Sequence, residues 1–225
     1  RYGVEDPKLR RFRYGVQVNS LGLTEQQPEN NVYRILLEML AVVLSKNARA
    51  RAVQLPAWNE ALGLPRPWDQ QWSIRLQQVV AFETDLVEYG DIFDGATVIA
   101  AKVEALSAQA REELQRIEEL GGAVNAVESG YMKRRLVESN AQRVAAIESG
   151  DQVVVGVNRF TEAEPSPLAT GEGSIMTVDP RAEADQIALL NAWRGQRDAA
   201  RVRQALTDLA AAAKDGRNIM PFSIA

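Results

Sequence analysis

Cysteine and histidine are both missing from this chain of 225 residues. Without cysteine there is no disulfide, and neither zinc nor an iron–sulfur cluster can be bound through thiolates. Without histidine, the Ser-His-Asp triad, the Cys-His dyad and histidine-ligated metal centres are excluded as well. Chemistry based on carboxylate, lysine or tyrosine side chains stays open. The absence of cysteine suits a reducing compartment, so we expect a cytoplasmic location.

Long apolar runs and an excess of positive charge are missing too. The best candidate run, Ile35 to Leu44, is interrupted by Glu38 and falls short of the roughly 20 apolar residues that span a bilayer. The first residues lack the apolar segment of a signal peptide, and the chain does not open with Met. With 26 basic and 30 acidic residues, the formal net charge is −4. We therefore expect neither a membrane nor nucleic acid as partner.

Alternating strand and helix patterns fill the first ninety residues. Aromatic and β-branched residues recur with period two over residues 11–19, and a second alternating segment covers residues 49–55; both are predicted strands. Apolar residues at helical spacing predict a helix over residues 32–44, with Asn30 as its N-cap, and another over residues 68–88. This order is typical of a parallel α/β sheet, either a barrel or a doubly wound fold.

Helical patterns dominate after residue 90. Helices are predicted over residues 96–120, 123–129, 131–149 and 181–214, and each of the first three is followed by glycine. The buried stripe of the first is expected to comprise Val98, Val103, Leu106, Ala110, Leu114 and Ile117. Residues 153–157 are predicted to be extended, and residues 161–179, rich in Glu, Pro, Ser and Gly, to form a linker or surface loop.

Two strand–helix units do not make a stable fold by themselves. Parallel strands are normally covered on both faces, and an eightfold barrel takes about 250 residues. We therefore expect the chain to be part of something larger. Residues 1–90 would supply about a quarter of such a barrel, residues 91–160 a helical region after it, and residues 161–225 a linker with a terminal helix.

Several unusual strings resemble one enzyme family. Residues 23–31 read Leu-Thr-Glu-Gln-Gln-Pro-Glu-Asn-Asn, residues 59–65 read Asn-Glu-Ala-Leu-Gly-Leu-Pro, and residues 117–123 read Ile-Glu-Glu-Leu-Gly-Gly-Ala. Further matches lie in residues 138–143 and 155–160. Their order and spacing resemble those of the adenosylcobalamin-dependent acyl-CoA mutases, the methylmalonyl-CoA mutase family. No Walker or dinucleotide fingerprint competes with this resemblance.

Within the family, the chain resembles the ethylmalonyl-CoA branch. Leu21 and Gly22 stand where methylmalonyl-CoA mutases usually have Gly-Trp-Ser, and residues 45–59 replace the usual string Thr-Gln-Ser-Leu-His-Thr-Asn. Because of these departures, acyl-CoA contacts of the methylmalonyl enzymes are not carried over to this strand.

The resemblance implies a fold and a reaction. The fold would be the last two units of a (β/α)8 TIM barrel, followed by a mostly helical wrap. The reaction would be the radical carbon-skeleton isomerisation of ethylmalonyl-CoA to methylsuccinyl-CoA, with methylmalonyl-CoA specificity as the alternative. The cofactor would be adenosylcobalamin (coenzyme B12), bound mainly by parts outside this chain. The partners would be the acyl-CoA substrate, a preceding barrel portion, a following cobalamin domain and a second copy in a homodimer. The chain alone would be inactive.

The resemblance also assigns residues. Gln17, Glu60, Ala61 and Leu64 match cofactor-contacting positions, and Leu21 would pack beside the corrin ring. No catalytic residue and no metal ligand is expected in this segment. From the residues alone, Gln17 is an ordinary polar strand residue and Glu60 a charge favoured at a helix N-terminus.

Other candidates have plainer interpretations. Arg49 and Arg51 could pair with a phosphate or carboxylate of acyl-CoA, although salt-bridged scaffolding is the commoner role. The tryptophans Trp58, Trp68 and Trp72 are expected in a core or an interface. Helical surface charge explains the carboxylates of Asp69, Glu83, Asp85 and Glu88.

A different class of function is a free-standing helical binding or assembly module that uses the helices after residue 96. The two predicted strands speak against it, because they would expose unpaired edges.

Overall fold

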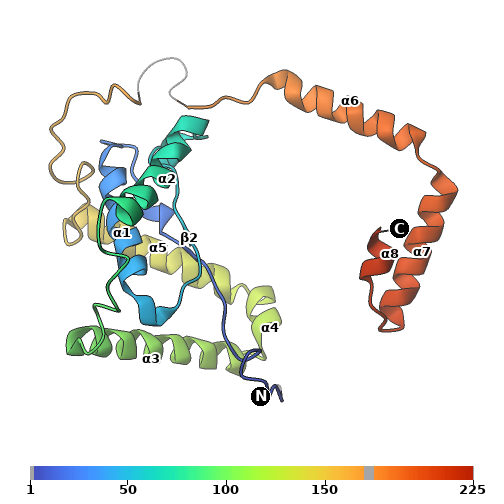
Figure 1. Ribbon diagram of the computed structural model, residues 1–225, viewed down its shortest axis with the longest axis horizontal. Coiled ribbons are helices and arrows are strands. Elements are labelled where there is room, and N and C mark those ends of the chain that lie inside the picture. Colours follow the sequence, from blue (N-terminus) through green and yellow to red (C-terminus); the bar gives the residue numbers. More distant parts are fainter. Residues whose placement is uncertain (1–2, 170–174, 225) are drawn as a thin grey trace. The chain divides into compact units, whose positions relative to one another are not determined.

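The computed structural model describes residues 3–169 and 175–224 (Figure 1). The chain divides into two compact units, with the boundary between Met176 and Thr177. Within the described residues, no helix combines the length and apolar character needed to cross a membrane.

A two-stranded parallel sheet lies at the centre of the first unit. Strand β1, Val16–Gln17, pairs with strand β2, Val53–Gln54, and helix α1, Asn30–Leu44, connects them. The expected strand–helix–strand order is confirmed, but both strands are much shorter than predicted. Backbone bonds such as Arg51 N to Tyr14 O, 2.9 Å, extend the pairing only a little. Alternation in sequence marks residues suited to a strand, whereas strand length depends on a partner along the whole edge.

Helix α1 covers this sheet with one apolar face. Ile35 and Met39 on that face are buried. Asn30 was expected to be the N-cap, and this is wrong, because Glu29 is the N-cap residue. Asn30 is the first residue of the helix, and its side-chain amide donates to Gln27 Oε1 at 2.9 Å. The core comprises Val18, Ile35 and Trp58, with partly buried neighbours Leu23, Val32, Val42, Val53, Leu55, Trp72, Leu76 and Leu168.

Helix α2, Pro67–Phe82, follows the short 3-10 helix η3, Glu60–Leu62. It ends six residues before the predicted end. The Thr84 hydroxyl donates to Val80 O at 2.6 Å and so closes the final turn with a side chain. Of the three tryptophans assigned to a core or interface, Trp58 is buried and Trp72 packs against it, whereas Trp68 is exposed and lies under the Arg66 guanidinium.

Three helices continue the chain: α3, Thr97–Glu119, α4, Ala123–Glu128, and α5, Tyr131–Ser149. The glycine stops are confirmed, because Gly121, Gly122, Gly130 and Gly150 all have the positive φ that glycine tolerates best. The predicted buried stripe of α3 is wrong: no residue of this helix is buried, and Val98 and Leu114 are more than half exposed. Periodicity shows which face is apolar, but not whether another element covers it.

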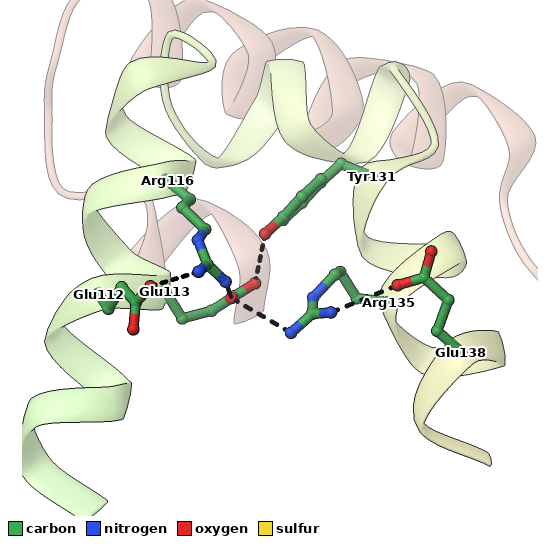
Figure 2. Close-up of polar contacts among 6 residues, drawn as sticks. All are labelled: Glu112, Glu113, Arg116, Tyr131, Arg135 and Glu138. Carbon is green, nitrogen blue, oxygen red and sulfur yellow. Dashed lines mark hydrogen bonds and ion pairs between the residues drawn. The ribbon is translucent and has the colours of Figure 1, made fainter. Parts of the chain in front are cut away.

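Figure 2 shows the polar cluster that ties α3 to α5. The Tyr131 hydroxyl donates to Glu113 Oε1 at 2.7 Å, while Arg116 and Arg135 approach Glu113 Oε2 at 3.3 and 3.7 Å. The Tyr131 hydrogen bond, followed by the charges and hydrogen bonds of the arginines, lowers the pKa of Glu113. The cluster is therefore built around an ionised Glu113.

The segment after α5 returns to the start of α1. It forms a turn with a bridge between Val155 and Arg159, not the predicted extended segment 153–157. The reason is the Asn158 side chain, which accepts from Val154 N at 2.7 Å and donates to Ile147 O at 2.7 Å. Gln27 Nε2 then donates to Phe160 O at 2.8 Å. The loop predicted over 161–179 has no helix or strand in its described part; residues 170–174 lie outside the described residues.

The second unit contains α6, Pro180–Gln196, α7, Ala199–Lys214, and α8, Met220–Ile224. The single helix predicted over 181–214 is thus two helices. Asp198 has extended backbone angles, and its carboxylate accepts from Ala200 N and Arg201 N at 2.8 and 3.0 Å, which starts a new helix. Ala212 on α7 is buried, and α8 packs against α7.

The first prediction concerns the α3–α5 cluster. Tyr131→Phe removes the hydroxyl that holds Glu113, so amide hydrogen exchange in the second half of α3 should speed up by about two- to fivefold. Tyr33→Phe is the matched control, since Tyr33 is exposed and its hydroxyl has no partner among the described residues. Equal exchange in Tyr131→Phe and the parent would contradict this role.

The second prediction concerns pH and helix α7. Hydrogen bonds from the backbone N–H of Arg201 and of Ala200 lower the pKa of Asp198 below 3.8. Its contribution to helix stability is therefore present above pH 3.8 and lost as pH falls through the lower folded pKa. A peptide covering residues 197–216 should lose helical circular dichroism in that acid range, and Asp198→Ala should be less helical at pH 7 without that loss. An Asp208→Ala peptide is the control and should still lose helical circular dichroism in the acid range. Equal helicity of the Asp198→Ala peptide and the parent peptide at pH 7 would contradict the capping role.

Candidate functional site

The carboxyl ends of β1 and β2 lie at the same edge of the sheet, because the strands are parallel and Gln17 is paired with Gln54. At this edge β1 leads into residues 18–29 and β2 into residues 55–66. Ligand sites of parallel α/β folds lie at such carboxyl ends. This edge is therefore the candidate site of the chain.

The structure brings together two of the predicted cofactor-contacting residues. Gln17 and Glu60 both line one hollow of about 320 Å³, along with Gln54 and Gln70. Both side chains are exposed, and neither forms a side-chain hydrogen bond or ion pair with another described residue. An amide and a carboxylate with unused hydrogen-bonding capacity suit a ligand rich in amide and hydroxyl groups.

The other predicted contact residues lie nearby but do not line this hollow. Ala61 is half-buried in η3, and Leu64 follows it with its side chain exposed. Leu21, on the loop after β1, is 80% exposed and lines a separate hollow of about 600 Å³. All five assigned residues thus belong to β1 or to the two loops at this edge.

The larger hollow is framed by two arginines. Arg34 on α1 donates to Asn31 Oδ1 at 2.7 Å and to Val155 O at 2.9 Å, so it links α1 to the turn after α5. Burial lowers the pKa of Arg34. Arg143 on α5 donates to Leu21 O at 3.3 Å. These contacts hold α1 and the loop after β1 against α5 and the turn that follows it.

Arg49 and Arg51 lie before β2, at the opposite edge of the sheet from Gln17 and Glu60. Arg49 has φ 62°, in the left-handed region, where it ends a 3-10 turn. Arg51 lines a hollow of about 260 Å³ with Lys46. Neither arginine forms an ion pair within the described residues. The structure therefore separates them from the candidate site.

The buried polar side chains in the described part of the chain lie in the loops at this edge or on the helices next to them. Asn31 donates to Thr24 O and Trp58 O, both at 2.9 Å, and accepts from Thr24 N at 3.0 Å. Ser73 on α2 donates to Pro56 O at 2.6 Å. The remaining two are Asn59, within the loop, and Asp69, in the first turn of α2.

Asp69 was expected to be a helical surface charge, and this is wrong: its side chain is fully buried. Its Oδ2 accepts from Arg66 N and Arg66 Nε, both at 2.8 Å. Burial alone would raise the pKa of Asp69, but the hydrogen bonds from the Arg66 side chain and backbone outweigh it and keep the pKa below the ordinary value. The residue is an anchor for the end of the loop.

Sequence reasoning missed these anchors, although a signal exists. Asp69, Ser73 and Val80 are spaced as one stripe of α2, and Asn31 precedes Ile35 and Met39 at intervals of four on α1. A polar residue on an otherwise apolar stripe has to find a buried partner. Backbone carbonyls and N–H groups of the two loops are those partners.

No group of acidic residues that could hold a metal ion occurs among residues 3–169 and 175–224. The side chains that line the candidate site offer amide, carboxylate and apolar contacts.

Comparison with known proteins identifies the family of the chain. The family model for methylmalonyl-CoA mutase matches residues 1–225. Ethylmalonyl-CoA mutase of Cereibacter sphaeroides is 69% identical over the whole chain, which covers 34% of that protein. Ethylmalonyl-CoA mutase of Methylorubrum extorquens is 68% identical over the whole chain and 33% of its own length. Methylmalonyl-CoA mutase of Escherichia coli is 32% identical over 99% of the chain and 30% of its own length.

The chain thus spans about a third of the length of the curated relatives it matches. The match extends over the strands, both loops of the candidate site and the second unit. This chain belongs to the methylmalonyl-CoA mutase family.

Proposed function

We propose that this chain is the closing part of the catalytic barrel of an acyl-CoA mutase, and that the edge defined by Gln17 and Glu60 faces adenosylcobalamin. The observation that carries the proposal is the meeting of these two side chains in one hollow at the carboxyl ends of paired parallel strands. In a (β/α)8 barrel this edge is the mouth, where the ligand sites of the fold lie.

The order β1–α1–β2–α2 supports the barrel. Each strand is followed by a helix, and the connection through α1 returns to a parallel neighbour. Both strands have an outer edge without a strand partner in the described residues, as expected for units whose neighbours come from the rest of a larger protein. Most of the other strands would come from a barrel portion that precedes this segment in the whole protein.

The division of labour follows from the side chains present. Adenosylcobalamin, when bound, supplies the radical chemistry, and the protein binds, orients and excludes water. Gln17 would donate and accept hydrogen bonds at the rim of the cofactor and Glu60 would accept them, while Ala61, Leu64 and Leu21 would provide apolar contact. A cobalt ligand and the residues that meet the reacting acyl group would come from outside this chain.

The substrate we propose is ethylmalonyl-CoA, with methylsuccinyl-CoA as product. Identities of 69% and 68% to ethylmalonyl-CoA mutases, against 32% to a methylmalonyl-CoA mutase, support this choice. The replaced string over residues 45–59 supports it as well. A cytoplasmic homodimer stays a prediction of the resemblance. A free-standing helical module is disfavoured, because the family match covers the strands and the helices together.

The third prediction tests the cofactor contact. Glu60→Gln in the full-length protein keeps the size of the side chain but removes its charge, so the Kd for adenosylcobalamin should rise about tenfold. The measurement is a titration followed by the corrin absorbance. Glu25→Gln is the control, an exposed carboxylate on the loop after β1 with no partner among the described residues. An unchanged Kd in Glu60→Gln would contradict the contact.

The fourth prediction tests the reaction. The full-length protein should isomerise ethylmalonyl-CoA only with added adenosylcobalamin, and at a higher kcat/KM than methylmalonyl-CoA. A purified polypeptide of residues 1–225 should show no turnover with either substrate, since it supplies neither the rest of the barrel nor a cobalt ligand. Turnover by that polypeptide, or preference for methylmalonyl-CoA by the full-length protein, would overturn the respective part of the proposal.

A further inference from the structure

The loop over residues 56–66, here called the Glu60 loop, is held at both ends by buried polar bonds. At its start, Ser73 donates to Pro56 O and Asn31 donates to Trp58 O. At its end, Asp69 accepts from the backbone and side chain of Arg66. Between these anchors, Glu60 is exposed toward the hollow that it shares with Gln17.

Such bonds are expensive to place inside a protein. A buried carboxylate or amide destabilises the fold unless its partners compensate for lost water. In the described part of the chain, the buried polar residues are Asn31, Asn59, Asp69 and Ser73, and each belongs to this loop or bonds to it or its neighbouring loop. An apolar set would have satisfied packing alone, so their concentration points to control of the position of this loop.

We infer that Asp69 is a positioning residue: by fixing Arg66, it sets the place of the Glu60 loop against the cofactor. The inference rests on the proposed function, because it takes Glu60 as a cofactor contact. The carboxylate does not touch the hollow itself; Ser73, one turn further along α2, does line it. Helix α2 therefore holds both ends of the Glu60 loop: Ser73 bonds to Pro56 at its start, and Asp69 bonds to Arg66 at its end.

The Arg66 bonds lie where the loop enters helix α2. Arg66 is the residue before helix α2, and its N–H bond to Asp69 fixes the angle at which the loop enters the helix. The loop between these points contains a 3-10 turn and Gly63, with φ 146°, and its Leu64 O accepts from Met176 N at 2.8 Å. Without the Asp69 bonds, Glu60 would sample several positions, and binding would have to select one of them.

The test is a double-mutant cycle on the full-length protein, with adenosylcobalamin as the titrant. Asp69→Asn should raise the Kd about tenfold, while the KM for ethylmalonyl-CoA at saturating cofactor stays within about twofold. The double variant Asp69→Asn/Glu60→Gln should bind only about threefold more weakly than the weaker single variant, because both changes disable one contact. Glu83→Gln, an exposed carboxylate just beyond α2, is the matched control and should leave the Kd unchanged.

A second variant keeps the test valid if Asp69→Asn does not fold. Ser73→Ala removes the bond to Pro56 O and should raise the Kd about threefold, again less than multiplicatively with Glu60→Gln. The outcomes separate the two ideas. An unchanged Kd in Glu60→Gln overturns the cofactor contact itself. The positioning role alone is overturned if Glu60→Gln raises the Kd but Asp69→Asn and Ser73→Ala leave it unchanged. It is also overturned if the effects of Glu60→Gln and of either anchor variant on the Kd multiply in the double variant.

Discussion

The Asn31 side chain is the interaction on which the rest of the candidate site depends. One amide bonds to both backbone groups of Thr24, on the loop after β1, and to the carbonyl of Trp58, on the loop after β2. These loops are joined by only two paired residues in each strand, so the short sheet cannot fix their relative position by itself. A fully buried amide with several partners can, since loosening it would leave polar groups without water or protein partners.

This constraint explains where the chain places its apolar core. Trp58 lies directly beside the bonded carbonyl and packs with Val18 and Ile35, so the polar and apolar anchors of the two loops coincide. The α5 side adds a second layer, in which Arg34 joins Asn31 to the turn at Val155. The string over residues 23–31 thus has a physical function: its Thr24 and Asn31 supply groups that hold the two loops together.

Sequence reasoning identified the parts governed by local rules. The apolar period of α1 and the positive-φ glycines Gly122 and Gly150 follow from the local sequence, and the strand–helix–strand order predicts the parallel pairing. It failed where a distant partner decides. Strand length depends on what pairs with the edge, and the exposure of α3 depends on what covers it. The break at Asp198 was missed although its capping chemistry is local, because many alanines and charges on both sides favour helix.

The residues of the candidate site were likewise predicted only in part. Gln17 and Glu60 were assigned by resemblance to a family, and the structure adds that they share one hollow. Asp69 was misread because a carboxylate near a helix N-terminus is usually a surface charge favoured by the helix dipole. Its position four residues before Ser73 places it on the inward face of α2, and its position three residues after Arg66 allows the two side chains to pair. A charge on an inward face has to be paired, and the pair it makes fixes the residue that ends the Glu60 loop. The bonds between Asp69 and Arg66 therefore cap helix α2 and fix the end of the Glu60 loop at the same time.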